Sequence, residues 1–223
     1  MIYTIGGIKG GTGKTTLALN LAVVLSRHGR DVLLVDADRQ KTASDLTDIR
    51  SETLEEQVGY TLTRLHGKEV KVQVQQQLDK YDDIIIDCGG VDSDSLRAGL
   101  LVCDVFLTPF QPRTTDILAF EQTEELVSTA RDFNEDLRAY SFLSRASLRG
   151  SWNQEAAGVL TDSEVMGFIN APLMERVVYA YAQAMGLSIV EYSPKDDKAI
   201  QELYTMLSQA VTDVALQVPT QVQ

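Results

Sequence analysis

Eight consecutive residues, Lys9–Thr16, have the composition of a phosphate-binding loop. Gly13, Lys14 and Thr15 match the end of the pattern G-x-x-x-x-G-K-[ST]. Glycines let backbone N–H groups approach phosphate oxygens, and a following helix adds the partial positive charge of its N-terminus. Lys14 is expected at the β- and γ-phosphates, Thr15 at Mg²⁺, and Thr16 near the α-phosphate. The candidate phosphate-binding residues are therefore Lys9, Gly10, Gly11, Thr12, Gly13, Lys14, Thr15 and Thr16.

Three carboxylates follow apolar runs that resemble buried strands. Asp36 and Asp38 come after the run 31–35, and Asp87 ends the run Ile-Ile-Ile-Asp. Ligands of open α/β sheets bind at the carboxyl ends of the strands, so these side chains are expected beside the phosphate loop. The pattern at Asp87 is typical of an aspartate that holds Mg²⁺ through water. An Asx turn or a helix N-cap is the alternative role for Asp36 and Asp38.

The elements that must position these residues alternate between strands and helices. Strand 2–8, the glycine loop, helix 14–28 and strand 31–35 predict a βαβ unit with a right-handed crossover. Residues 42–80 are polar and predicted to be helical. Further strands are predicted at 84–87, 102–109, 140–143 and 164–170, and helices at 116–133, 152–160, 175–185 and 196–217. The fold class is α/β, a three-layer parallel-sheet P-loop NTPase fold in a single domain, residues 1–217, with a frayed tail at 218–223.

The phosphate loop and the segment Val35–Gln40 together resemble the ParA/MinD family of deviant Walker A ATPases, closest to the short, ParF-like plasmid-partition type. The family pattern is K-G-G-x-G-K-[ST]-T followed by D-x-D-P-Q. Here Ile8 stands at the first glycine of the ordinary loop, and Arg39 stands where the family has proline. The resemblance implies ATP and Mg²⁺ as cofactors. It also implies a homodimer that buries two ATP molecules, in which Lys9 reaches the phosphates of the partner's ATP.

The same resemblance implies roles for individual residues. The catalytic residues would be Lys9, Lys14 and Asp38, with Asp38 positioning the attacking water. The metal residues would be Thr15, Asp36 and Asp87, and further nucleotide-binding residues would be Pro109, Pro172 and Arg176. For Arg176 the alternative is an exposed arginine on a solvated helix. The segment Cys88-Gly89-Gly90 stands where family members sense the γ-phosphate, and a plain flexible turn is its alternative.

Composition limits the class of protein. The chain has 223 residues, 44% of them hydrophobic and 23% charged, which suits one globular domain. Cys88 and Cys103 are predicted to be buried free thiols. The net charge of −12 is unlike that of a protein that coats DNA, so DNA contact would need a local patch or one assembled by dimerisation. The candidate DNA contacts are Arg145, Arg149, Lys195 and Lys198.

We expect a slow, Mg²⁺-dependent, partner-stimulated ATP hydrolase that segregates DNA, with a ParB-like or other adaptor as partner. It would be cytoplasmic and nucleoid-associated in its ATP state. Because the chain opens on the phosphate-loop strand, no sequence-specific operator binding is expected. A positioning ATPase for a non-DNA cargo is the alternative. A MinD-like membrane switch needs a basic amphipathic C-terminal helix, whereas residues 215–223 contain a proline and no Lys or Arg, so no membrane binding is expected. A relative of the nitrogenase iron protein would need cysteines at the dimer face, and a dethiobiotin-synthetase-like enzyme is a further alternative.

Overall fold

A seven-stranded parallel sheet forms the centre of the molecule. The computed structural model describes residues 1–147 and 151–218, and within these ranges the strand order is β3-β2-β4-β1-β5-β6-β7. Every strand pairs in parallel with its neighbours. The strands are β1 (Ile2–Ile5), β2 (Val32–Asp36), β3 (Thr61–Arg64), β4 (Asp83–Asp87), β5 (Val105–Phe110), β6 (Arg138–Ala146) and β7 (Gly167–Met174).

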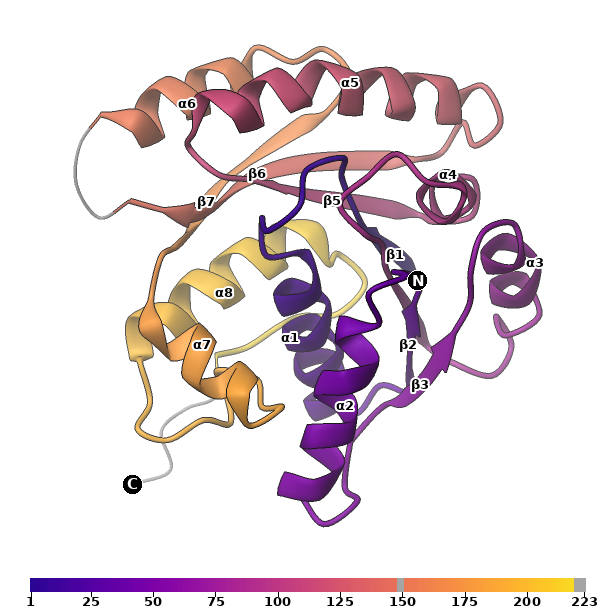
Figure 1. The fold of residues 1–223 in the computed structure, drawn as a ribbon, viewed down its shortest axis with the longest axis vertical. Coiled ribbons are helices and arrows are strands. Elements are labelled where there is room, and N and C mark those ends of the chain that lie inside the picture. Colours follow the sequence, from indigo (N-terminus) through magenta and orange to yellow (C-terminus); the bar gives the residue numbers. More distant parts are fainter. Residues whose placement is uncertain (148–150, 219–223) are drawn as a thin grey trace.

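Helices cover both faces of this sheet (Figure 1). One face packs against α1 (Lys14–Arg27), α2 (Thr42–Thr53), α7 (Val177–Ala184) and α8 (Asp197–Ala210). The other packs against α3 (Glu69–Gln75), α4 (Asp94–Leu100), α5 (Thr114–Arg131) and α6 (Trp152–Thr161). The predicted single-domain, three-layer α/β fold is confirmed.

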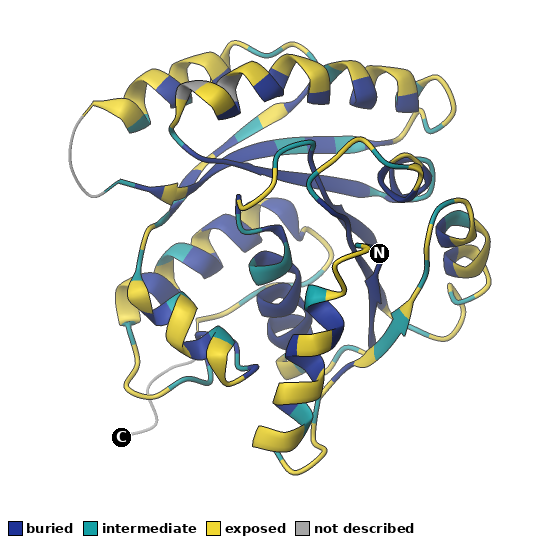
Figure 2. Cartoon of the chain, viewed as in Figure 1, coloured by how far each residue is buried: buried dark blue, intermediate teal, exposed yellow. Residues whose placement is uncertain are grey.

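Each central strand supplies both hydrophobic cores. In β4, Ile85 enters the core beneath α1 and α8, whereas Ile84 and Ile86 enter the core beneath α4 and α5. This follows from the two-residue period of a strand, and it explains why the strand is apolar throughout. Figure 2 shows the central strands as buried and the outer faces of the helices as exposed. A continuous apolar run is therefore what a strand covered on both faces requires.

The carboxyl ends of the central strands meet at one edge of the sheet. Ile5 at the end of β1 pairs with Asp87 at the end of β4, and Asp87 pairs in turn with Asp36 at the end of β2. The loop Gly6–Gly13 leaves β1 at this edge and leads into α1. Because β2 and β5 lie on opposite sides of β1, the loop occupies the position where α/β sheets bind ligands.

Some predicted elements differ from the structure. The region 42–80 is not helical throughout, because β3 lies within it. This four-residue edge strand pairs with β2 and is only partly buried, so it lacks the apolar pattern that marks the central strands. Helix α4 was not predicted, β7 extends four residues beyond the expected strand, and α8 ends at Ala210 rather than 217.

Two further expectations concern the chain's cysteines and its relation to membranes. Cys88 and Cys103 are free and buried, as predicted. Among the described residues, none of the helices combines the length and apolar character that a membrane crossing needs. The expected tail at 218–223 falls almost wholly outside the described residues, as does Arg149.

Candidate functional site

The phosphate loop joins β1 to α1 through two glycines in left-handed conformations. Gly11 has φ 75° and Gly13, the N-cap residue of α1, has φ 97°. Such φ values are accessible to glycine without the steric cost that a Cβ would add. No side chain caps the N-terminus of α1, and no acidic residue lies in its first turn. The helix therefore presents free N–H groups and an uncompensated partial positive charge to the loop, which favours an anion there.

Lys14 is the buried cation of the loop. Its side chain lies almost wholly out of solvent, and its Nζ donates a hydrogen bond to the Lys9 carbonyl oxygen over 2.6 Å. Burial lowers the pKa of Lys14, and the carboxylates of Asp87 and Asp38 oppose that shift. A buried ammonium with one carbonyl acceptor retains donors for a phosphate. The loop is thus folded around a cation in the arrangement that anion binding needs.

Asp87 is a buried carboxylate without a partner. Among the described residues, neither of its oxygens has a hydrogen-bond partner, although the side chain is fully buried. Its pKa is raised to about 7, mainly by burial; the nearby Thr15 hydroxyl lowers it, the Asp36 carboxylate raises it and the Lys14 ammonium lowers it. The Thr15 hydroxyl is close enough to affect the pKa of Asp87 but does not form a hydrogen bond of ordinary geometry with it. Buried polar groups nearly always have partners, so an orphaned carboxylate beside a lysine and a threonine fits a hydrated divalent cation.

Asp36 differs from Asp87 although the two are register partners. One of its oxygens accepts hydrogen bonds from the backbone N–H and the hydroxyl of Ser44, over 2.8 and 2.5 Å. The other accepts the Asp38 N–H over 3.2 Å. Asp36 therefore anchors the first turn of α2 to the end of β2. The structure places it beside the candidate metal residues, with both oxygens engaged by the protein.

Asp38 lies between the phosphate loop and the turn after β4. Its Oδ1 accepts the backbone N–H of Gln40 over 3.1 Å. A Cβ on Gly89 would lie 2.8 Å from the same oxygen, and a Cβ on Gly90 would lie 2.5 Å from the Cα of Gly10. A side chain at Gly90 would clash with the backbone of the phosphate loop, and one at Gly89 would force the Asp38 side chain to move. The two glycines therefore let the turn pack between Asp38 and the phosphate loop, which a plain flexible turn does not require.

Two residues from neighbouring strands bind the tip of the loop. The carbonyl oxygen of Gly11 accepts a hydrogen bond from Gln111 Nε2 over 2.8 Å and a longer one, 3.4 Å, from Arg145 Nη1. Gln111 follows β5 and is itself bonded through its N–H to the buried Asp116. Gln111 was not predicted as a site residue. Its only signal in the sequence is its place directly after a buried strand at the same edge of the sheet.

Two adjoining cavities surround the loop. The first, of about 480 Å³, lies over the loop and includes Asp38, Arg39, Gly90 and Thr42. The second, of about 340 Å³, extends between α1, β7 and α7 and is lined in part by Tyr179 and Leu203. They share Gly13, Thr16, Arg145 and Gln183. The first is polar and suits phosphates, and the second suits a nucleoside. We refer to them as the phosphate cavity and the nucleoside cavity.

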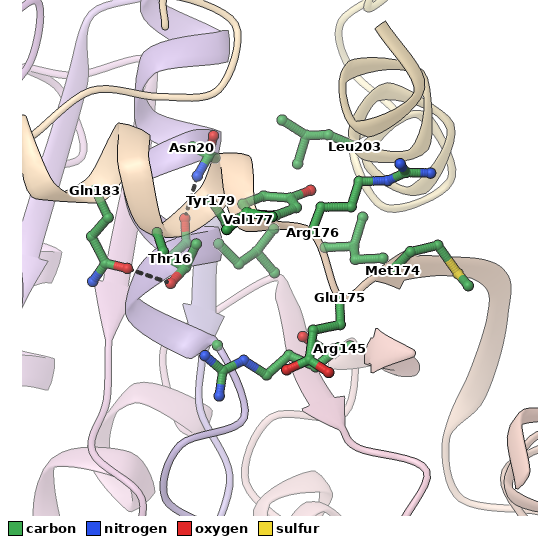
Figure 3. A pocket seen from close by; sticks show the side chains of 15 residues that line it. Thr16, Asn20, Arg145, Met174, Glu175, Arg176, Val177, Tyr179, Gln183 and Leu203 are labelled. Carbon is green, nitrogen blue, oxygen red and sulfur yellow. Dashed lines mark hydrogen bonds between the residues drawn. The ribbon is translucent and has the colours of Figure 1, made fainter. Parts of the chain in front are cut away.

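The three further residues predicted to bind the nucleotide, Pro109, Pro172 and Arg176, are not all brought to this site. Arg176 lines the nucleoside cavity, but its guanidinium turns toward α8 (Figure 3) and pairs with Glu202 over 2.5 Å and with Asp196 over 3.5 Å. Pro172 lies inside β7 and Pro109 inside β5, and neither lines either cavity. Among the predicted DNA contacts, Lys195 and Lys198 are exposed near the start of α8, whereas Arg145 is at the nucleotide cavities.

The remaining residues of the prediction surround the phosphate cavity. Gly10, Gly11, Gly13, Lys14, Thr15, Thr16 and Asp38 all line it. Thr12 is buried, and its hydroxyl has no partner among the described residues. No cluster of three or more His, Cys, Asp or Glu side chains that could hold a metal occurs in the described ranges. Mg²⁺ usually takes one or two carboxylates together with phosphate oxygens and water, so Asp87 with Thr15 is sufficient protein ligation for a nucleotide-bound ion.

Comparisons with known proteins agree with this geometry. Maintenance of carboxysome distribution protein A (McdA) of Halothiobacillus neapolitanus is 27% identical over 210 residues, covering 93% of this chain and 94% of that protein. A plasmid partition protein of Borrelia burgdorferi B31 bound to AMPPNP has the same fold, with TM-score 0.74, 21% identity and coverage of 93% and 97%. MinD of Pyrococcus horikoshii complexed with Mg-ADP has TM-score 0.74, 20% identity and coverage of 95% and 96%.

A family match covers almost the whole chain. The sequence model of the CobQ/CobB/MinD/ParA nucleotide binding domain matches residues 3–220, which include the phosphate loop and the aspartates Asp36, Asp38 and Asp87. The resemblance of Lys9–Thr16 and Val35–Gln40 to ParA/MinD proteins is thereby confirmed. With its glycine loop at the N-terminus of α1 and its seven-stranded parallel sheet, the chain belongs to the CobQ/CobB/MinD/ParA nucleotide-binding family.

Proposed function

We propose that this protein is a slow, Mg²⁺-dependent ATPase that dimerises with ATP and segregates DNA by binding it non-specifically. The observation that carries the proposal is the state of Lys9. This residue is half-buried at the start of the phosphate loop, and its ammonium has no hydrogen bond or ion pair with any residue that the structure describes. Its backbone carbonyl oxygen accepts a hydrogen bond from Lys14, but its side-chain ammonium has no such partner among the described residues. A cation held beside a phosphate site without a partner of its own is available to a second subunit's nucleotide.

Each residue of the phosphate cavity has a role in this proposal. The loop N–H groups and Lys14 bind the β- and γ-phosphates, and the partial charge at the N-terminus of α1 adds to their attraction. Thr15 and Asp87 hold Mg²⁺, which supplies charge neutralisation at the phosphates. Asp38 orients the attacking water, because it is the carboxylate that lines the phosphate cavity. Asp36 supports Asp38 by accepting its N–H.

The proposed ATPase cycle depends on a change of conformation in the turn after β4, which Gly89 and Gly90 permit. ATP in the phosphate cavity would contact Asp38 and the turn after β4, which pack against one another. Dimerisation would then bring Lys9 to the partner's phosphates and assemble the surface that binds DNA. An adaptor on the cargo would stimulate hydrolysis and release the dimer. A low intrinsic rate suits such a switch, since the ATP state must outlast the search for the adaptor. The protein would act in the cytoplasm, on the nucleoid.

A second candidate is a positioning ATPase for a cargo that is not DNA. Two observations favour it: the McdA relative distributes carboxysomes according to its name, and the net charge of −12 opposes DNA contact. Both candidates use the same nucleotide switch and differ in what the adaptor carries.

Binding to a non-specific DNA duplex tests the proposal. It would be measured with ATP, with ADP and without nucleotide, at two salt concentrations, with Asp38→Ala used to maintain the ATP state. We expect binding with ATP only, weakened steeply by salt and abolished by Lys9→Ala. ATP-dependent dimerisation without DNA binding would favour the second candidate. Unchanged ATP binding by Lys14→Ala would contradict both candidates.

A further inference from the structure

Arg145 has a backbone conformation that its strand does not require. Its φ is 51°, in the left-handed region that side-chain-bearing residues rarely adopt. Among the described non-glycine residues with positive φ, which are Lys41, Glu55, Glu56 and Arg145, it alone lies within a strand. The pairing of β6 with β7 shifts register just before Arg145, between Phe142 and Ser144, and again across it, between Ser144 and Ala146. Such bulges re-aim a side chain, often beside an active site.

The bulge takes one side chain out of the buried pattern. Ser144 and Ala146 are buried, whereas Arg145 between them is exposed. Its guanidinium lies over the phosphate loop, where Nη1 donates to the Gly11 carbonyl oxygen at 3.4 Å. That carbonyl already accepts a shorter hydrogen bond from Gln111. The contact of Arg145 with the loop is therefore long and redundant, and it does not account for the strained backbone.

The left-handed backbone of Arg145 places its side chain where the two cavities meet. The side chain lines the phosphate cavity and the nucleoside cavity, at the junction that Gly13 and Thr16 also form. It has no ion pair with any carboxylate in the described ranges. The other arginine of the nucleoside cavity, Arg176, is neutralised by Glu202 and Asp196. Among the described residues that line this junction, Arg145 thus carries a guanidinium that is not paired with a carboxylate.

We infer that Arg145 is a further nucleotide-binding residue, which donates hydrogen bonds to phosphate oxygens where the nucleoside and phosphate cavities meet. The inference rests on the proposed ATP binding. On binding, the guanidinium exchanges its long bond to Gly11 for charge-assisted bonds to the nucleotide, and Gln111 keeps the Gly11 carbonyl satisfied. The same side chain is then unavailable as a DNA contact in the ATP state.

The test compares the affinities of Arg145→Gln, Arg145→Gly and a matched control for ATP and ADP by titration calorimetry with Mg²⁺. Arg113→Gln is the control, because Arg113 is an exposed arginine that shares a third cavity with Arg145 but lines neither nucleotide cavity. We expect both Arg145 variants to bind about 10- to 100-fold more weakly, the value of a charge-assisted hydrogen bond, and Arg113→Gln to bind as wild type does. Because glycine accepts positive φ, Arg145→Gly should lose affinity without any fall in melting temperature.

Two outcomes would overturn the inference while leaving ATP binding intact. Equal affinities of Arg145→Gln and Arg113→Gln would mean that the guanidinium does not touch the nucleotide. A loss in Gln111→Leu as large as that in Arg145→Gln would mean that Arg145 acts through the Gly11 carbonyl. If the wild-type protein binds neither ATP nor ADP, the proposed function itself is wrong.

Discussion

Asp36 and Asp87 end neighbouring parallel strands in the same register, yet of the two only Asp36 has hydrogen-bond partners among the described residues. Both side chains are fully buried. Ser44 and the Asp38 N–H donate hydrogen bonds to Asp36, whereas no described group donates one to Asp87. Two aspartates at equivalent strand ends thus differ in role. Asp36 fixes the start of α2, whereas both carboxylate oxygens of Asp87 remain without a described hydrogen-bond donor.

The orphaned carboxylate predicts a pH dependence of stability in the ligand-free protein. The pKa of Asp87 is about 7 in the folded state, whereas the ordinary pKa of an aspartate, which applies in the unfolded chain, is 3.8. The folded state therefore binds the proton more tightly than the unfolded chain, so the contribution of Asp87 to stability falls as pH rises from about 4 to about 7, by at most about 1.4 kcal/mol per pH unit. Urea unfolding in EDTA should show Asp87→Asn gaining stability relative to wild type between pH 5 and pH 8. A constant difference between the two proteins would contradict this.

The hydroxyl of Ser44 is predicted to stabilise the fold through Asp36. Ser44→Ala removes a buried hydrogen bond to a carboxylate and should lower the free energy of unfolding by about 1–3 kcal/mol. Ser208→Ala is the control, because its exposed hydroxyl bonds only within α8; it should change stability by less than about 0.5 kcal/mol. Urea midpoints measure both variants, and equal midpoints would exclude this role for Ser44.

Gly90 is predicted to tolerate no side chain. A Cβ there would meet the Gly10 backbone at 2.5 Å, so Gly90→Ala must displace the turn or the phosphate loop, at a cost of about 1–3 kcal/mol. ATP affinity should fall with it, because the displaced loop is the phosphate site. Gly158→Ala in α6 has open space around its Cβ and should instead stabilise by about 0.5–1 kcal/mol. Thermal unfolding distinguishes the two, and a Gly90→Ala variant as stable as wild type would refute the packing argument.

A buried ion pair is predicted to hold α2 against the segment after α7. Arg50 is buried, and it binds Glu191 through two hydrogen bonds of 2.6 and 2.8 Å. Arg50→Ala leaves Glu191 without its partner and should cost about 3–5 kcal/mol. The pair Arg97–Asp92 has similar distances but is about half exposed, so Arg97→Ala should cost less than about 1 kcal/mol. Similar losses in the two variants, measured by urea unfolding, would show that burial does not separate these pairs.

The predictable parts of the site are those whose chemistry is local. Lys9–Thr16 carries its glycines, its lysine and its hydroxyls in one run, and a loop between a strand and a helix needs nothing else to face phosphate. Asp36 and Asp87 were identified because each ends a run of buried residues. The edge strand β3 was missed for the converse reason: with one neighbour and little burial, its residues need not be apolar.

Residues that depend on distant partners could not be found in this way. Gln111 is 100 positions from the carbonyl that it binds, and its sequence neighbours do not reveal that contact. The same holds for the closeness of Gly90 to Gly10, and for Arg176, whose pairing with Glu202 depends on where α8 lies. Pro109 and Pro172 mark strands of the sheet, but their places within β5 and β7 keep them out of both cavities.

The sequence by itself determined the fold class, the phosphate loop and the strand-terminal aspartates, because each depends on periodicity or on contiguous residue types. The tertiary structure decided which aspartate has hydrogen-bond partners, which arginine is paired with carboxylates, and which arginine has a left-handed backbone beside the two cavities. Those outcomes depend on hydrogen bonds and ion pairs between elements far apart in the chain, such as Arg176 with Glu202 and Arg145 with Gly11. Such pairs form only when packing has brought the elements together, so no local pattern records them.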